Sequence, residues 1–169
     1  ALHAHGVPAA CIAEPPPEAA QFDSEALWHV IGARPWRGVR AIVVRGVGGR
    51  DWLAEQLAAQ GAQVTFVEAY RRSLPVLGDD ERALLQQAGD DPAQAVWLFS
   101  SSQAVAHLRQ LAQLSDWSSG CAMATHPRIA QTLRSAGFGT VWSVRPTLNA
   151  VLDVWRRSLQ SMPAPDQRP

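Results

Sequence analysis

The stretch that decides the fold runs from residue 40 to residue 70 and reads RAIVVRGVGGRDWLAEQLAAQGAQVTFVEAY. Residues 40–45 form a short, β-branched apolar run, and residues 51–60 repeat their apolar side chains at the period of a helix. Gly61 stands where a helix commonly ends with a residue of positive φ, and residues 63–69 form a second strand-like run. A strand, a helix and a strand in this order predict a βαβ unit with parallel strands.

The same alternation of short apolar runs and helical periods continues on both sides of this unit. Upstream we expect a strand at 8–13, which ends at the triple proline 15–17, and a helix that starts at Asp23 or Ser24 and ends near Ile31. Downstream we expect strands at 95–99, 121–124 and 141–144, with helices up to 88 and at 103–113, 127–137 and 147–159. This pattern predicts an α/β fold built on parallel sheets.

An internal similarity suggests two duplicated halves. The pair Leu2 and Gly6, followed by a strand, a proline and a helix, is echoed by Leu133 and Gly137 with the same elements after them. The first copy opens inside its first helix, so we expect its upstream elements to lie outside these 169 residues. The periodicity is interrupted near residues 74–80, which divides the chain into a first lobe at 1–76, a second lobe at 77–160 and a flexible tail or linker at 161–169.

Composition narrows the class of protein. The chain has 47% hydrophobic and 18% charged residues, as expected of a soluble globular protein, and its 15 basic and 15 acidic side chains offer no long-range field for nucleic acid. Its apolar runs are much shorter than the roughly 20 residues that cross a bilayer. Cys11 and Cys121 are isolated, and the five histidines form no ligand set, so we expect neither a disulfide nor a metal, and a cytoplasmic location without a signal peptide.

The glycine-rich turn after the strand at 40–45 is a candidate anion site. It comprises Arg45, Gly46, Gly48, Gly49 and Arg50, and backbone N–H groups at a strand-to-helix junction favour negative charge. It matches neither the dinucleotide fingerprint nor the phosphate-binding loop that ends in Lys-Ser/Thr. The alternative is a tight turn in which glycine only supplies positive φ.

Two further junctions and one tyrosine complete the candidate set. The residues concerned are Ser100, Ser101 and Ser102 after one strand, His126, Arg128 and Ile129 after another, and Tyr70 at the end of a third. The carboxyl ends of parallel strands are the usual ligand crevice, where an arginine fork suits a carboxylate and a phenol could donate a proton. The alternatives are a serine helix cap, an exposed first-turn arginine and an aromatic side chain that closes the core.

Taken in order, these motifs resemble those of the uroporphyrinogen-III synthase family over nearly the whole chain up to about residue 160. The segments that carry the resemblance are residues 22–27, 43–53, 61–64, 70–72, 99–102, 126–130 and 137–138. The family's tyrosine at this strand end corresponds to Tyr70. This chain has His126-Pro127-Arg128-Ile129 where many family members have a threonine-containing turn.

The resemblance implies a fold, a reaction and a substrate. The fold would be two flavodoxin-like lobes, each incomplete in this chain because partner strands come from an N-terminal segment, with the active site between them. The reaction would be the cofactor-free closure of hydroxymethylbilane, which carries eight carboxylates, with inversion of its last pyrrole. Tyr70 would be the proton donor, and the three junctions would bind carboxylates. We expect a monomer, and some relatives carry a further domain after the tail.

Two other classes of protein fit parts of the pattern. A non-catalytic flavodoxin-like receiver or anion-binding domain would explain the glycine turn without Tyr70. A receiver, however, needs an acidic cluster and a lysine, and this chain has no lysine. A nucleotide-dependent oxidoreductase would need the third glycine of the fingerprint, which this chain lacks after Gly46 and Gly48.

Overall fold

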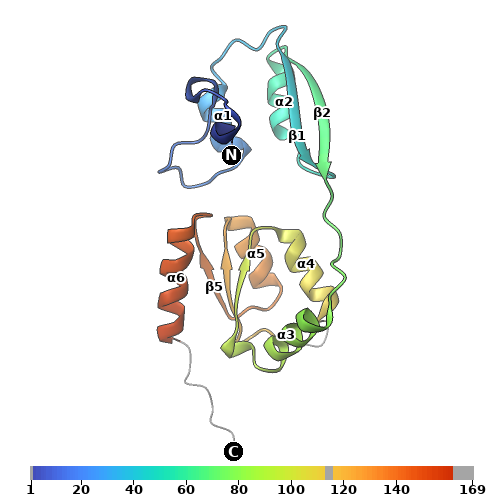
Figure 1. Cartoon of the computed structure of the whole chain (residues 1–169), viewed down its shortest axis with the longest axis vertical. Coiled ribbons are helices and arrows are strands. Elements are labelled where there is room, and N and C mark those ends of the chain that lie inside the picture. Colours follow the sequence, from blue (N-terminus) through green and yellow to red (C-terminus); the bar gives the residue numbers. More distant parts are fainter. Residues whose placement is uncertain (1, 113–115, 162–169) are drawn as a thin grey trace, which may run out of the picture. The chain divides into compact units, whose positions relative to one another are not determined.

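A computed structural model describes residues 2–112 and 116–161 of the chain (Figure 1). The chain forms two compact units, unit 1 comprising Ala1–Ser73 and unit 2 comprising Leu74–Pro169. Each unit contains its own parallel sheet with helices packed on it. The predicted α/β class with parallel sheets is therefore confirmed.

Unit 1 is centred on the βαβ unit that the sequence predicts. Its elements are η1 (Leu2–His5), η2 (Ala9–Cys11), α1 (Ser24–Ile31), β1 (Arg40–Gly46), α2 (Trp52–Ala59) and β2 (Gln63–Tyr70). Strands β1 and β2 pair in parallel, with Arg40 opposite Gln63 and Gly46 opposite Tyr70 after an irregularity at the end of β1. This pairing brings the glycine turn and Tyr70 together at the carboxyl end of the sheet.

Local sequence signals account for the ends of the helices in unit 1. The Asp23 carboxylate accepts a hydrogen bond from the Ala26 N–H at 2.9 Å, and so caps α1. Gly61 follows α2 with φ +88°, a conformation that costs a residue with a Cβ atom much more than it costs glycine. Helix α2 buries Ala54 and Leu57, while Trp52 meets Trp28 of α1 edge to face, with ring centroids 6.4 Å apart.

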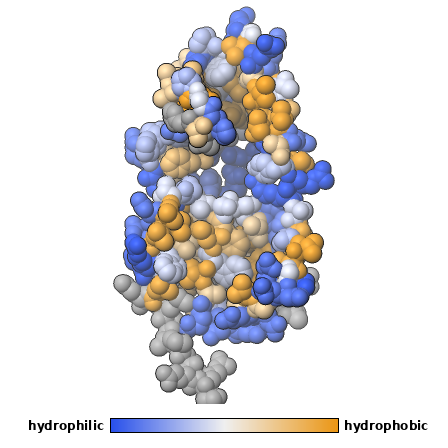
Figure 2. Space-filling view, in the orientation of Figure 1, coloured by the Kyte–Doolittle hydropathy of each residue, from blue (hydrophilic) through white to orange (hydrophobic). Residues whose placement is uncertain are grey.

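One face of the two-stranded sheet remains open. Ile42 and Val44 are 68% and 64% exposed although both belong to the apolar run of β1, and Val67 opposite Val44 is 45% exposed. Such a face is normally covered in an α/β protein, because parallel strands are apolar on both sides. Figure 2 shows apolar side chains on the surface of both units.

The predicted strand at 8–13 is wrong. The chain there forms the short 3₁₀ helix η2, preceded by Pro8. A strand needs a neighbour to satisfy its backbone hydrogen bonds, and the sheet of unit 1 in the described residues consists of β1 and β2 alone. The corresponding segment of the second copy, β5, does have a neighbour in β4.

Unit 2 is a three-stranded parallel sheet in the order β3-β4-β5. Its elements are α3 (Asp79–Asp90), η3 (Pro92–Gln94), β3 (Val96–Phe99), α4 (Ser102–Leu111), β4 (Cys121–Ala124), α5 (Pro127–Ser135), β5 (Thr140–Ser143) and α6 (Leu148–Ser161). The last row of paired residues is Phe99, Ala124 and Ser143. The three strand ends therefore lie at one edge of the sheet, side by side.

A well-packed core supports this edge. Val105, Leu133 and Ala122 are completely buried, and Trp117 stacks on Phe138 with ring centroids 5.4 Å apart. Pro127 occupies the first turn of α5, as predicted, and Gly137 follows that helix with φ +97°. Gly6 in the first copy also has positive φ, at +79°.

The end of the chain differs in part from the prediction. Ser161, expected in the tail, is the last residue of α6, and residues 162–169 of the predicted tail lie outside the described residues. Among the helices that the structure describes, none is both long enough and apolar enough to span a membrane.

Candidate functional site

In unit 1 the glycine turn is tied to the end of β2 by backbone hydrogen bonds. The Val47 N–H donates to the Tyr70 carbonyl at 2.9 Å, and the Gly49 N–H donates to the Gly46 carbonyl at 3.2 Å. Gly48 has φ +71°, so the turn needs glycine at this position for its backbone conformation. The turn is thus a tight βα connection whose shape depends on the position of Tyr70.

Tyr70 lies against the buried Gly46, and the residue is 50% exposed. The Nη2 atom of Arg72 donates a hydrogen bond to the Tyr70 hydroxyl at 2.9 Å, and the Arg72 guanidinium carbon lies 4.8 Å from the centre of the Tyr70 ring. The phenol oxygen thus accepts from a cation while its own proton remains available for donation. The sequence pattern points to Tyr70 but assigns no task to Arg72, because the contact depends on how the chain leaves β2.

Gly46 leaves the space that Tyr70 occupies. A Cβ atom at Gly46 would stand 2.4 Å from Cε2 and 2.7 Å from Cζ of Tyr70, closer than two carbon atoms can approach. We expect Gly46→Ala to displace the tyrosine ring and to reduce turnover nearly as much as loss of Tyr70 itself, while unit 2 is unaffected. Steady-state kinetics checks this. Gly38→Ala is not a suitable control, because Gly38 has positive φ and alanine would strain the backbone there. Unchanged kcat in Gly46→Ala would contradict the link between this glycine and Tyr70.

Arg45 is engaged within unit 1. Its Nη1 atom donates to the Gly49 carbonyl at 3.0 Å and forms an ion pair with the Asp51 carboxylate. Its guanidinium carbon lies 4.1 Å from the centre of the Phe66 ring. These contacts stabilise the conformation of the glycine turn. A substrate carboxylate at Arg45 would have to compete with the Asp51 carboxylate for the guanidinium.

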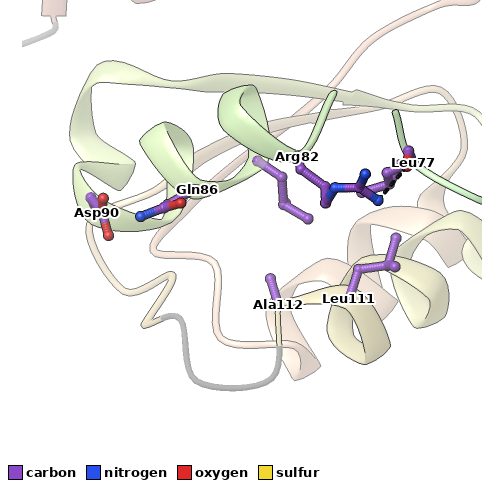
Figure 3. A pocket seen from close by; sticks show the side chains of 7 residues that line it. Leu77, Arg82, Gln86, Asp90, Leu111 and Ala112 are labelled. Carbon is purple, nitrogen blue, oxygen red and sulfur yellow. Dashed lines mark hydrogen bonds between the residues drawn. The ribbon is translucent and has the colours of Figure 1, made fainter. Parts of the chain in front are cut away.

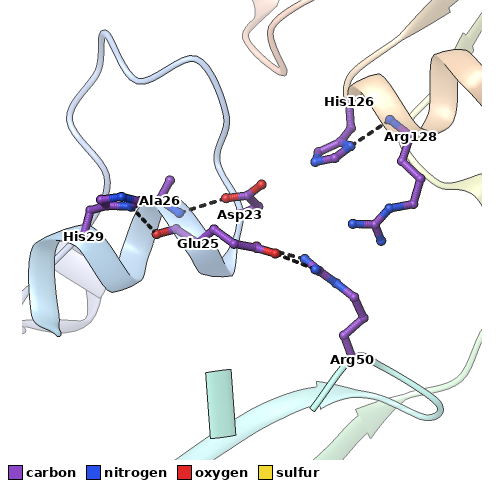
Figure 4. A network of polar contacts seen from close by, with 7 residues as sticks. All are labelled: Asp23, Glu25, Ala26, His29, Arg50, His126 and Arg128. Atoms are coloured by element: carbon purple, nitrogen blue, oxygen red, sulfur yellow. Dashed lines mark hydrogen bonds and ion pairs between the residues drawn. The ribbon is translucent and has the colours of Figure 1, made fainter. Parts of the chain in front are cut away.

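Arg50 is also engaged, by a carboxylate from α1 (Figure 4). Its two terminal nitrogens donate to the two oxygens of Glu25 at 2.5 and 2.9 Å. This hydrogen-bonded pair raises the pKa of Arg50 above its usual value. The pair links the end of the glycine turn to the first turn of α1, 25 residues earlier in the chain, a contact that no spacing in the sequence predicts.

In unit 2, the serines after β3 are divided between exposed and structural positions. Ser101 caps α4, since its hydroxyl accepts from the Gln103 N–H at 3.2 Å. Ser102 is the first residue of α4, and its hydroxyl lies 3.3 Å from the Thr132 hydroxyl of α5. Ser100 is exposed at the strand end. A serine cap was the structural alternative for this segment, and Ser101 fulfils it.

His126 after β4 caps α5 in the same manner (Figure 4). Its Nδ1 atom accepts from the Arg128 N–H at 3.1 Å, so the proton of the neutral ring is assigned to Nε2. Arg128 itself is exposed on the first turn of α5.

Ile129 belongs to the core. Its side chain is only 6% exposed, and its N–H donates to the His126 carbonyl at 3.0 Å. A substrate could contact Ile129 only if its side chain left the core or its N–H lost the hydrogen bond to the His126 carbonyl. The geometry therefore gives Ile129 a packing role.

Two hollows of unit 2 lie along α3 and α4 rather than at the predicted site residues. One of about 430 Å³ lies between α3 and the end of α4, where Arg82 donates to the Leu77 carbonyl at 2.6 Å (Figure 3). Another of about 270 Å³, almost wholly apolar, lies beside Trp97. None of the predicted site residues lines either hollow.

Comparison with known proteins identifies the family. The family model described as Uroporphyrinogen-III synthase HemD matches residues 1–153. The chain is 47% identical over 49 residues to the uroporphyrinogen-III synthase of Salmonella typhimurium, and 38% identical over 65 residues to that of Escherichia coli. These segments cover 29% and 38% of this chain, and 20% and 26% of the relatives.

A solved structure of a mutant uroporphyrinogen III synthase from Thermus thermophilus is similar to 83% of this chain, with 19% identity and a TM-score of 0.39. The matching part amounts to 56% of that protein. The chain thus spans well under two thirds of the length of these relatives. The match of the family model to residues 1–153 nevertheless covers nearly the whole sequence, and the chain belongs to the uroporphyrinogen-III synthase family.

Proposed function

We propose that this chain is part of a hydro-lyase that closes hydroxymethylbilane to uroporphyrinogen III in haem biosynthesis, in the cytoplasm and without a cofactor. The family match over residues 1–153 supports the reaction class. The observation that carries the proposal is a tyrosine at the carboxyl end of β2 whose hydroxyl accepts a hydrogen bond from Arg72 at 2.9 Å.

Tyr70 is the proposed acid. Its phenol gives a proton to the terminal hydroxyl of the bilane, and the C–O bond breaks to release water and leave an azafulvenium cation. The last pyrrole attacks this cation, inverts through a spiro intermediate, and loses a proton as the macrocycle forms. The N–H of Arg72 stabilises the negative charge that develops on the phenol oxygen when its proton leaves.

The strand ends of unit 2 are proposed to bind the acetate and propionate groups. Ser100, Ser101 and Ser102 supply hydroxyl and N–H donors, His126 lies at the start of α5, and the exposed Arg128 offers a planar fork. Restraining several carboxylates converts a flexible linear polyanion into one curled conformer, which lowers the entropic cost of ring closure.

The glycine turn of unit 1 is proposed to add backbone donors. Arg45 and Arg50 support that turn through Asp51 and Glu25, and Gly48 sets its conformation. In this proposal the two arginines act chiefly by shaping the turn around Gly46 and Gly49, and Ile129 anchors the start of α5. The two units are proposed to be parts of the two lobes of the family, divided near residue 76, in a monomeric enzyme.

A coupled assay tests the reaction. The full gene product that contains these 169 residues is supplied with hydroxymethylbilane, and the type III and type I products are separated by chromatography. We expect predominantly type III product, because uncatalysed closure proceeds without inversion of the last pyrrole. Type I product alone, at the rate seen without protein, would reject the activity and favour a non-catalytic anion-binding domain.

A further inference from the structure

One side of β5 has no neighbouring strand in the part of unit 2 that the structure describes, since the sheet order is β3-β4-β5. The Thr140 and Val144 N–H groups donate to carbonyls on the β4 side of the strand, at 3.1 and 2.9 Å. Alternate residues of a parallel strand bond to the same neighbour. The backbone N–H and C=O groups of Val141 and Ser143 therefore point away from β4, where a further strand could pair with them. We call this side the free edge of β5.

A hollow of about 460 Å³ opens along the free edge. Residues 141–143 of β5 line it together with residues of α5 and α6, among them Arg134 and Arg157. Consecutive side chains of a strand point to opposite faces of a sheet, so a hollow that touches three of them in a row reaches around the edge of the strand. The backbone groups that point away from β4 thus belong to the wall of this hollow.

The wall of the hollow carries positive charge and no carboxylate. Arg134 is exposed in the last turn of α5, and none of the described carboxylates forms an ion pair with it. A cation in that turn complements the helix dipole, but the dipole does not account for the lack of an acidic neighbour. The Nε atom of Arg157 donates to the Asp153 carbonyl at 3.1 Å. The inference below uses the charge of Arg157 and does not require its N–H groups to be free.

The chain around the hollow is basic as well. Residues 117–152, which include β4, α5 and β5, contain three arginines and neither aspartate nor glutamate. By contrast, residues 79–91, which form α3 and the turn after it, contain five carboxylates and one arginine. This separation of charge within unit 2 favours an acidic partner at β5 and disfavours a basic one.

The arginines also bear on which partner could pair with the free edge. Proteins protect edge strands by keeping them short and by placing charged side chains beside them, and β5 has four residues. Two copies of this edge would bring Arg134 and Arg157 of one copy towards those of the other, so like charges oppose pairing between copies. The same charges attract an extended segment that carries carboxylates.

We propose that the free edge of β5 binds an extended acidic segment of a partner protein, which adds to the sheet beside β5. Val141 and Ser143 pair with its backbone, and Arg134 and Arg157 select for its carboxylates. The surface runs along the side of β5 and is separate from the strand-end turns that are proposed to bind the substrate. The inference is therefore independent of the proposed function.

The test measures the Kd of a fluorescein-labelled hexaglutamate peptide for the full gene product by fluorescence polarisation. Ser143→Pro removes an N–H of the free edge and keeps the hydrogen bonds to β4, because proline is tolerated in edge strands where its nitrogen faces away from the ladder. Ser143→Ala is the matched control, since it removes the hydroxyl and keeps the N–H. Arg134→Glu reverses a charge of the wall, and Arg109→Glu makes the same change at an exposed position of α4 outside the hollow.

We expect Ser143→Pro and Arg134→Glu each to raise the Kd about 10-fold or more, because the first removes a backbone hydrogen bond and blocks pairing while the second replaces attraction by repulsion. Ser143→Ala and Arg109→Glu should lie within about twofold of the wild type, and a hexalysine peptide should not bind. Circular dichroism establishes folding. Arg134→Glu, at an exposed position, decides the matter if the proline variant does not fold.

Absence of saturable hexaglutamate binding to the wild type would overturn the proposal, and so would an unchanged Kd in folded Arg134→Glu. Displacement of the peptide by free glutamate at the same concentration of carboxylate would overturn it too, because the hollow would then bind a small anion and not a strand. A dimer in sedimentation velocity that Ser143→Pro abolishes would show that a second copy occupies the edge instead. None of these outcomes affects the synthase activity, which the coupled assay tests separately.

Discussion

Replacement of Tyr70 by phenylalanine is expected to lower kcat about 100-fold or more, with KM changed little. A positioned general acid contributes about 10²- to 10⁴-fold to a rate, and phenylalanine removes the only titratable atom while it keeps the ring against Gly46. The Arg72 guanidinium would remain over the ring, at a centroid distance of 4.8 Å in the wild type, but would lose its hydrogen bond to the hydroxyl. The measurement is steady-state turnover of hydroxymethylbilane with separation of the two isomers.

Arg71→Met provides the control for this variant. Arg71 is the exposed neighbour of Tyr70 in the chain, so its replacement alters the surface beside the tyrosine without removing the phenol hydroxyl. We expect it to behave as the wild type. Full turnover in Tyr70→Phe would remove the tyrosine from the chemistry and would leave it as an aromatic side chain that closes the turn.

Substitution of Gly139 by alanine is expected to destabilise unit 2 by about 3 kcal/mol, the upper part of the range for overpacking. A Cβ atom at this position would lie 1.8 Å from the Ser118 carbonyl oxygen and 2.9 Å from its carbonyl carbon. Both are backbone atoms, so no side-chain rotation relieves the overlap. The Gly139 N–H also donates to the Trp117 carbonyl at 3.1 Å, and the clash would strain the contact that brings this loop against β5.

Chemical denaturation followed by tryptophan fluorescence measures this effect, because Trp117 is buried in the affected core. For a unit of about 100 residues each 1 kcal/mol lowers Tm by roughly 4–8 °C. Gly78→Ala is the matched control: a Cβ atom there would meet only the carboxylate end of the flexible Glu81 side chain, and Gly78 has an ordinary φ of −74°. Equal stability of the two variants would show that the loop before β4 can move to accommodate the added methyl group at little cost in the free energy of unfolding.

The residues of the glycine turn explain why its geometry was only partly predictable. Gly48 was recognisable because a positive φ is a local backbone property. The need for glycine at position 46 was not, because the obstacle is the ring of Tyr70, 24 residues later in the chain. The ion pair of Arg50 was not recognisable either, because its partner Glu25 belongs to α1, which precedes the strand in the chain.

Strand predictions succeeded or failed according to their neighbours. The runs at 40–46, 63–70 and 121–124 became strands because each has a parallel partner. The run at 8–13 has comparable apolar character but became a 3₁₀ helix, since a strand is stabilised by hydrogen bonds that another segment must supply. Propensity alone does not contain this information.

The amino-acid sequence by itself determined the α/β class, the helix ends at Asp23, Gly61 and Pro127, and the family to which the chain belongs, because these depend on periodicity, caps and the linear order of motifs. Only the tertiary structure decided which side chains of the turns are engaged. It joined Arg50 to Glu25, placed Arg72 on the Tyr70 hydroxyl and aligned the ends of β3, β4 and β5 at Phe99, Ala124 and Ser143. These relations depend on strand register and on packing between distant segments, which a linear pattern does not encode.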